Sequence, residues 1–345
     1  MLFRVSELGV SGLSREKILE IKDLSITFLQ GKEETRVVDS IRFDVHKGEV
    51  LGIVGESGCG KSVTSLSIMG LLPKKTSKLS GEILFQGKDL LKLNEKSLRK
   101  LRGNELAMVF QEPMTSLNPL FKIGNQLEES LRVHLSLTKK QAKERAIQIL
   151  KLVGLPRPEE LYGEYPHQLS GGMRQRVMIA MAMICDPKVL IADEPTTALD
   201  VTIQAQILKL MKDLNKKMET SIVFITHDLG VVAEMCDRVM VMYAGQVVEE
   251  GSVKTIFKNP KHPYTRGLMK SVPDIRKKNE RLYSISGQVP RPGTVQTGCL
   301  FAGRCEYAMA ECVKHSPPLY KLQDSHQSRC FLAREEALEH DEAFA

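Results

Sequence analysis

Two short segments of the chain have the residue types that bind phosphate. Residues 55–62 read GESGCGKS, the G-x-x-x-x-G-K-S pattern in which a glycine-rich loop surrounds nucleotide phosphates and a lysine reaches the terminal ones. Residues 169–176 read LSGGMRQR, and an LSGG turn offers a serine hydroxyl and backbone N–H groups to an anion at the start of a helix. Since the first loop is already a phosphate site, we expect the second segment to serve a nucleotide held by a partner molecule.

The surroundings of residues 55–62 are those expected of a nucleotide loop. The apolar run 50–54 predicts a buried strand before the loop, and a helix is expected over 61–72. We expect Lys61 to contact the terminal phosphates and Ser62 to bind Mg²⁺. The side chain of Cys59 is expected to be a small filler rather than a metal ligand. The residues expected to line the nucleotide are Gly55, Glu56, Ser57, Gly58, Cys59, Gly60, Lys61, Ser62 and Val63.

Acidic and histidine side chains follow two further apolar runs. Residues 189–194 read VLIADE, which places Asp193 and Glu194 at the carboxyl end of a predicted strand, where ligands of α/β sheets gather. We expect Asp193 to hold Mg²⁺ through water and Glu194 to act as the base for the attacking water. The run 222–226 leads to His227, which we expect to contact the terminal phosphate.

Two more residues are expected at the same site. Gln111 ends the apolar stretch 106–110, and its amide oxygen can bind Mg²⁺ or water while the following loop moves as a hinge. Phe28 ends a strand predicted over 21–28, and its ring can stack on adenine. Packing of Phe28 in the core is the alternative interpretation.

Composition and charge indicate a globular chain with reduced cysteines. With 345 residues, 42% of them hydrophobic, the chain can bury a sizeable core in two or three units. The sequence has neither a signal-peptide pattern nor a window of roughly 18 uncharged apolar residues, so we expect neither export nor membrane insertion. The net charge of +7 is spread out, unlike that of most nucleic-acid binders, and the basic cluster at 276–281 is interpreted as a solvated linker. The odd count of seven cysteines argues against a disulfide framework.

The order of apolar patterns predicts how the site residues are positioned. Short Val/Ile/Leu runs at 50–54, 189–192, 222–226 and 239–242 alternate with helical patterns, which is typical of a buried parallel sheet. Amphipathic stretches at 123–135 and 138–153 predict a helical subdomain, with Thr138 and Gln141 as a capping box and Gly154 as the stop. Past residue 260 we expect one short helix at HPYTRGLM and then an irregular tail.

Taken together, these motifs resemble the ATP-binding cassette of ABC transporters. GESGCGKS, Gln111, LSGGMRQR, VLIADE, TALD at 197–200 and His227 occur in the family's order. The resemblance implies an α/β P-loop NTPase core, with a RecA-like mixed sheet, an antiparallel β subdomain and a helical subdomain. It also implies that two cassettes enclose two ATP molecules. The residues implied to face the partner's ATP are Ser170, Gly171, Gly172 and Asp200.

The C-terminal part resembles the extension of oligopeptide/dipeptide permease ATPases. HPYTRGL at 262–268 is followed by four cysteines separated by five, six and seventeen residues, namely Cys299, Cys305, Cys312 and Cys330. This spacing by itself leaves an iron–sulfur cluster, zinc and unliganded thiols all open, because it matches no common zinc or ferredoxin pattern. The resemblance favours a [4Fe–4S] cluster. Cys185 and Cys236 lie in apolar patterns and are expected to be buried filler.

The resemblance also implies a domain division. It consists of an N-terminal extension over 1–17, an ABC ATPase domain over 18–260 with its helical subdomain at about 112–168, a C-terminal domain with the four cysteines over 261–335, and an acidic tail over 336–345.

The function implied is that of an ATP-hydrolysing, Mg²⁺-dependent energy-coupling subunit of an importer for oligopeptides or dipeptides. Such a chain is expected at the cytoplasmic face of the cell membrane, with a second ATPase subunit, either a related distinct chain or a second copy, and two transmembrane permease subunits. An extracytoplasmic solute-binding protein is an indirect partner, and no nucleic acid is expected. The alternatives are the same role for nickel or another solute, a soluble non-transport ATPase, and a redox-sensing iron–sulfur module.

Overall fold

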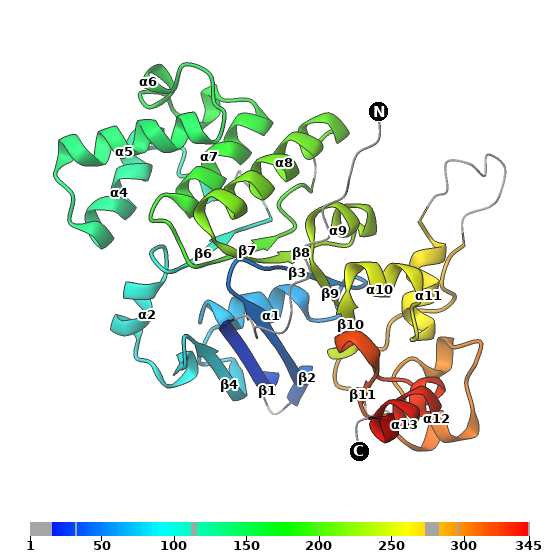
Figure 1. Ribbon diagram of the computed structural model, residues 1–345. Coiled ribbons are helices and arrows are strands. Elements are labelled where there is room, and N and C mark those ends of the chain that lie inside the picture. The colour runs from blue at the N-terminus through cyan, green and yellow to red at the C-terminus, as the bar shows by residue number, and fades with distance from the viewer. Residues whose placement is uncertain are drawn as a thin grey trace, which may run out of the picture.

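The computed structural model describes residues 16–31, 33–111, 116–197, 199–272, 283–294 and 297–343. Almost all of the expected N-terminal extension, the start of the expected hinge after Gln111 and the basic cluster at 276–281 lie outside these residues. Figure 1 shows two sheets with a helix between them, a group of helices beyond one end of the larger sheet, and a C-terminal extension beyond the other.

The larger sheet has eight strands in the order β11-β12-β10-β9-β3-β8-β7-β6. The five neighbouring strands β9, β3, β8, β7 and β6 run parallel to one another, whereas β10 is antiparallel to β9. These strands are continuous apolar runs because both faces are covered. Their bounds are β3 Val50–Val54, β6 Leu106–Val109, β7 Val189–Asp193, β8 Ser221–Ile225, β9 Arg238–Tyr243 and β10 Gln246–Ser252.

Helices cover both faces of this sheet. Alternate residues of β7 and β8 enter two different cores, so that Leu190 packs with one helix layer and Ile191 with the other. The helix α1 (Lys61–Ile68) lies between the two sheets, and its neighbour across the larger sheet is the pair α7 (Gly171–Met183) and α8 (Val201–Met218) (Figure 1). The expected helix over 61–72 is shorter than predicted, because Gly70 adopts φ 62° and ends the turn.

The smaller sheet is antiparallel, with the order β2-β1-β4-β5. Its strands are β1 (Lys17–Gln30), β2 (Glu33–His46), β4 (Ser77–Phe85) and β5 (Lys88–Asp89). The strand predicted over 21–28 is therefore longer at both ends, because β1 pairs with a neighbour on each side. A short 3₁₀ turn (Leu90–Lys92) and the helix α2 (Glu95–Leu101) connect this sheet to β6.

The predicted helical segment is present with the predicted cap. It contains α4 (Ile123–Leu135), α5 (Lys139–Leu152) and the short α6 (Pro158–Leu161). The Gln141 N–H donates to the Thr138 hydroxyl over 3.4 Å, and the Thr138 N–H donates to Oε1 of Gln141 over 3.0 Å. Gly154 then reverses the chain with φ 71°, as the sequence predicts.

The expectation of an irregular tail after the HPYTRGLM helix is wrong. The strands β11 (Tyr320–Lys321) and β12 (Gln327–Ser328) extend the larger sheet beyond β10, and β12 pairs with Glu249 and Glu250. Two-residue strands carry too little periodicity to be recognised in a sequence. Two helices, α12 (Ala310–Lys314) and α13 (Arg334–Ala343), also lie in this tail. The helices before it are α9 (Leu229–Met235), α10 (Val253–Lys258) and α11 (Pro263–Lys270), the last of which is the HPYTRGLM helix.

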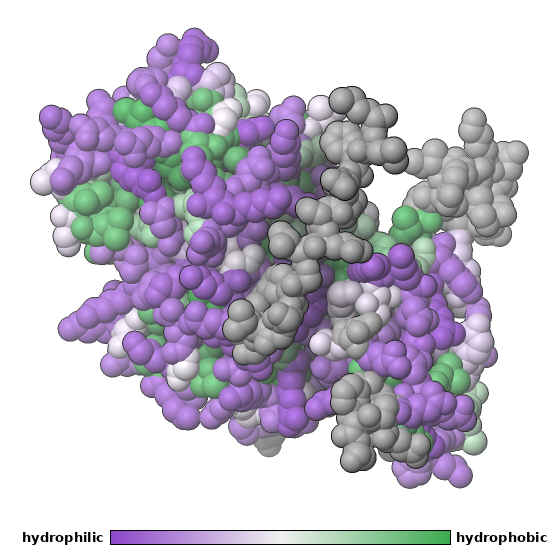
Figure 2. Space-filling view, viewed as in Figure 1, coloured by the Kyte–Doolittle hydropathy of each residue, from purple (hydrophilic) through white to green (hydrophobic). Residues whose placement is uncertain are grey.

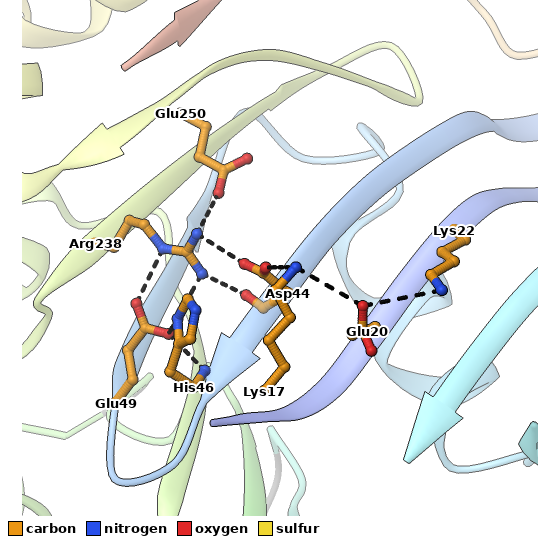
Figure 3. A network of polar contacts seen from close by, with 8 residues as sticks. All are labelled: Lys17, Glu20, Lys22, Asp44, His46, Glu49, Arg238 and Glu250. Atoms are coloured by element: carbon orange, nitrogen blue, oxygen red, sulfur yellow. Dashed lines mark hydrogen bonds and ion pairs between the residues drawn. The ribbon is translucent and has the colours of Figure 1, made fainter. Parts of the chain in front are cut away.

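A buried network of charges joins the two sheets (Figure 3). The Arg238 guanidinium on β9 donates to Asp44 of β2 over 3.0 Å, to Glu49 over 2.9 Å and to Glu250 of β10 over 2.9 Å. Burial raises the pKa of Glu250 to about 7, and the Arg238 charge opposes this rise. The arginine therefore compensates three carboxylates that come from different elements.

Replacing this arginine tests how far the two sheets depend on the network. Arg238→Ala leaves three carboxylates without their shared partner, so we expect the free energy of unfolding to fall by about 3–5 kcal/mol in urea denaturation. The control is Arg36→Ala, whose ion pair with Asp39 is exposed and should change stability by less than about 1 kcal/mol. Equal losses for the two variants would contradict a special role of the buried network.

Candidate nucleotide-binding site

The loop between β3 and α1 has a backbone that requires glycine. Gly55, Gly58 and Gly60 have φ values of 154°, 80° and 103°, in the region that other residues rarely adopt. A Cβ atom on Gly55 would lie 2.2 Å from the Met242 carbonyl oxygen of β9. The loop thus turns tightly against the sheet edge, which is the geometry that the GESGCGKS pattern predicts.

Lys61 lies inside this loop. Its buried ammonium group donates to the carbonyl oxygens of Gly55 over 2.7 Å and Glu56 over 3.1 Å, and it lies 3.7 Å from the Cys59 sulfur. Burial raises the pKa of the Cys59 thiol, which favours its neutral form. The arrangement therefore supplies one positive charge at the centre of the loop, as expected for a phosphate site.

The residues expected to bind magnesium are in contact. The Ser62 hydroxyl donates to Oδ1 of Asp193 over 3.2 Å, across from the start of α1 to the end of β7. Asp193 is only 6% exposed, and burial raises its pKa. A buried carboxylate beside a hydroxyl is a donor set that suits Mg²⁺, because a cation restores the charge balance that burial disturbs.

Three polar side chains converge on Glu194. The Gln111 amide and the Thr197 hydroxyl both donate to its Oε2 over 3.0 Å, and Nδ1 of His227 lies 3.3 Å from Oε1. The Glu194 backbone has φ 47°, a sparsely populated conformation for this residue type, which is often held at functional sites. The structure thus brings together Glu194, Gln111 and His227 from three separate strand ends.

Thr197 is a contact residue that the sequence reasoning did not assign. It belongs to the TALD segment, whose only assigned member was Asp200. Thr197 follows Glu194 by three residues, and its N–H donates to the Glu194 carbonyl oxygen over 3.2 Å. The sequence did contain a signal for this contact, because a threonine three residues after Glu194 can turn its hydroxyl back toward the Glu194 carboxylate.

Phe28 and Val63 lie at the borders of the loop region. Phe28 is half-buried and packs against the core between the two sheets, opposite Thr35 of β2 and Ser77 of β4. It lies two residues before the end of β1, so it does not close the strand as predicted. Val63 in α1 is also half-buried and packs against the same core.

The LSGG turn starts helix α7 and is open to solvent. Ser170 is the N-cap, and its hydroxyl accepts from the Met173 N–H over 3.3 Å. Ser170 and Gly171 are exposed, and a Cβ atom on Gly171 would meet nothing within 4 Å. Asp200 is likewise an exposed N-cap, of α8, and accepts from the Ile203 N–H over 3.0 Å. Among the described residues, no hydrogen bond joins this turn to the loop 55–62.

The four C-terminal cysteines line one small cavity. Cys299, Cys305, Cys312 and Cys330 all contribute to its wall, together with His262 and Phe301. Burial raises the pKa of Cys299 and Cys305, and that of Cys330 to about 11. Within the described ranges, no three His, Cys, Asp or Glu side chains are close enough to hold a metal ion.

The two other cysteines lie away from that cavity. Cys185 is buried just after α7, and Cys236 is half-buried after α9, where its sulfur would lie 2.9 Å from a Cβ atom on Gly52. Burial raises the pKa of Cys185 to about 11 and that of Cys236 further. Both cysteines therefore fill space in the core, as expected.

Comparison with known proteins agrees with this geometry. The ABC transporter family matches residues 38–197, and the C-terminal region of oligopeptide/dipeptide transporters matches residues 248–312. The oligopeptide transport ATP-binding protein AppD and the dipeptide transport ATP-binding protein DppD, both of Bacillus subtilis, are 53% and 50% identical to this chain. Each alignment spans 323 residues, or 93% of this chain, and covers 98% of AppD and 96% of DppD.

Solved structures give the same fold. The ATP-binding cassette MJ0796, a dimer in a post-hydrolysis state with ADP and Pi, has a TM-score of 0.61, is 30% identical and covers 68% of this chain and 98% of its own. The protein cbiO1 of Clostridium perfringens, part of the transporter complex cbiONQ, has a TM-score of 0.61 at 31% identity, covering 71% of this chain and 92% of its own.

The chain therefore belongs to the ATP-binding cassette proteins of ABC transporters, and it is an ATPase of that type. Its C-terminal region is that of the oligopeptide/dipeptide transporters within this family. No helix in the described part of the chain is long and apolar enough to span a membrane.

The contacts of Glu194 lead to a kinetic prediction. Glu194→Gln should still bind ATP, because Lys61 and the loop are unchanged, but it should slow hydrolysis by about 10²-fold or more, measured as phosphate release. Glu159→Gln, an exposed glutamate paired with Lys151 on the helical segment, is the matched control and should keep normal turnover. Near-normal hydrolysis by Glu194→Gln would exclude Glu194 as the base.

Proposed function

We propose that this chain is the subunit that couples ATP hydrolysis to the import of oligopeptides or dipeptides. The observation that carries the proposal is that one chain joins the Gly55–Ser62 loop, with its Ser62–Asp193 contact, to the C-terminal region of the peptide-transporter branch. Relatives at 50–53% identity over nearly their full length are named as oligopeptide and dipeptide transport ATP-binding proteins, which supports the same class of cargo.

The roles proposed for the site residues follow from their chemistry. The loop N–H groups and Lys61 bind the phosphates, while Ser62 and Asp193 hold Mg²⁺, the Asp193 contact running through water. Glu194 accepts the proton of the attacking water, and His227 orients the terminal phosphate from the other side of that carboxylate. The Gln111 amide, which now donates to Glu194, can turn its oxygen to Mg²⁺ or water when ATP is bound. Phe28 stacks on the adenine ring.

The exposed LSGG turn is proposed to act on the ATP of a second cassette. Ser170, Gly171 and Gly172 present a hydroxyl, N–H groups and the positive end of α7 to solvent, which favours an anion. Asp200 lies at the start of α8, beside Val201, which is 82% exposed. An exposed apolar side chain at the start of a helix is consistent with a contact between two cassettes. The second cassette is either a related chain or a second copy of this chain.

The membrane partners are proposed to dock on the helical segment after Gln111. Apolar side chains stand in solvent there, including Leu120 at 80% exposed and Phe121. Figure 2 shows apolar surface over the part of the molecule that carries α4 and α5. This surface follows the proposed hinge in the chain. When the two cassettes close, it would therefore move and transmit that movement to two permease subunits bound there. That contact would place the chain at the cytoplasmic face of the membrane.

The four-cysteine cavity is proposed to hold a [4Fe–4S] cluster. Cys299, Cys305, Cys312 and Cys330 line this one cavity, and a cationic iron centre held there would stabilise thiolates against the burial that raises the pKa of Cys299, Cys305 and Cys330. The cluster would supply four iron–thiolate bonds that tie η3 (Ala302–Arg304), α12 and the chain after β12 together.

The cargo is tested by deleting the gene and measuring uptake. We expect loss of labelled dipeptide or oligopeptide uptake, with normal uptake of nickel, and we expect the wild-type gene but not Glu194→Gln to restore it. Loss of nickel uptake with unchanged peptide uptake would replace peptides by nickel as the cargo. Unchanged uptake of every solute would favour a soluble, non-transport ATPase.

The cluster is tested by its metal content. Protein purified without oxygen should be brown and carry about four irons per chain with matching sulfide. Cys299→Ser should lose this iron, whereas Cys236→Ser, which changes a cysteine outside the cavity, should keep it. Stoichiometric zinc in the wild-type protein, or no metal at all, would contradict the cluster.

A further inference from the structure

The phosphate loop contains an acidic residue, Glu56, that the extension holds at two points. The Glu56 backbone N–H donates to the Tyr264 hydroxyl over 2.9 Å. Its carboxylate accepts two hydrogen bonds from the Arg304 guanidinium, over 3.1 and 3.2 Å, in a bidentate pair. The Glu56 carbonyl oxygen accepts from Lys61, so one residue connects the extension with the lysine of the loop.

Arg304 is fixed by its surroundings. Its side chain is 7% exposed and lies over the rings of Tyr243 and Phe301, with centroid distances of 5.7 and 5.9 Å. Besides Glu56, its N–H groups donate to the carbonyl oxygens of Ser286 and Ile285 and to the Tyr243 hydroxyl, over 2.9–3.3 Å. All five donors of the guanidinium therefore have a partner. A side chain held in this way has one orientation.

The elements that present Arg304 and Tyr264 belong to the cysteine-containing extension. Arg304 ends η3 and directly precedes Cys305, and Tyr264 lies in α11. The rings of Tyr264 and Phe301 pack 5.4 Å apart, and Phe301 also lines the cysteine cavity. The contact to Glu56 thus spans 248 residues of sequence and joins two parts of the molecule that have separate motifs.

A carboxylate in a phosphate loop works against nucleotide binding unless its charge is compensated. The polyphosphate of ADP or ATP is strongly negative, and like charges at short range in a partly buried site repel each other. The paired guanidinium cancels the Glu56 charge and turns the carboxylate toward the extension. Without Arg304, the same carboxylate would be free and charged in the loop.

We propose that Arg304 is a positioning residue for the ATP site, which neutralises and orients Glu56 so that the loop accepts phosphate. The four-cysteine extension thereby supplies part of the support of the nucleotide site. This inference rests on the proposed role of Gly55–Ser62 as the phosphate loop. If the wild-type protein failed to bind MgADP, that role would be wrong, an outcome distinct from those below.

A double-mutant cycle tests the proposal, with the dissociation constant of MgADP measured by calorimetry. Arg304→Ala should weaken MgADP binding roughly tenfold or more, because it leaves the Glu56 charge uncompensated. Glu56→Gln removes the charge itself and provides the second background, in which its own MgADP affinity is the reference. In the Glu56→Gln background, Arg304→Ala should then cost less than about threefold.

A structural role of Arg304 gives a different pattern. Arg304→Ala would then lower the melting temperature without changing MgADP affinity, or it would weaken binding equally in both backgrounds, and either result would overturn the proposal. The matched control is Arg334→Ala, in the same extension, where the arginine pairs with Glu311 over 2.5 Å and lies over Phe331 but does not touch the loop. Its MgADP affinity should equal that of the wild type.

Discussion

The site depends on the register of three parallel strands. Ile53 of β3 and Asp193 of β7 both lie opposite Ile225 of β8, so the chain leaves all three strands at the same edge of the sheet. The phosphate loop, Glu194 and His227 follow within two or three residues of that level. A slip of one residue in either pairing would exchange the two buried faces of a strand and remove Asp193 from Ser62. The packing of helices on both faces therefore fixes the spacing of the chemical groups.

The C-terminal extension is joined to the side of the larger sheet through β10. The buried Glu249 carboxylate accepts from the backbone N–H of His262 over 3.0 Å and lies 2.8 Å from Nε2 of His326, so one side chain anchors both ends of the extension. β12 then pairs alongside, and η3 reaches the phosphate loop with Arg304. The extension is thus in contact with the phosphate loop, and Cys305 directly follows the arginine that makes this contact.

Local signals in the sequence predicted most of the fold and the centre of the site. Apolar runs bounded the parallel strands to within one or two residues, and the Thr138 cap was predicted correctly, because these features depend on neighbouring residues. Features that depend on distant partners were missed. The strands β11 and β12 form only because β10 offers an edge, and Arg304 gains its role from Glu56, far away in the chain. The strand predicted to end at Phe28 was too short, because the length of β1 is set by its pairing with two neighbouring strands.

We propose that a working ATP site needs two cassettes, with the loop of one and the LSGG turn of the other. The most direct test is the structure of the Glu194→Gln protein with its partner cassette and MgATP. We expect ATP bound to Gly55–Ser62 of this chain to contact the serine of the partner's LSGG turn, and Ser170 of this chain to contact the partner's ATP. A structure in which Ser170 contacts the ATP of its own chain would contradict it.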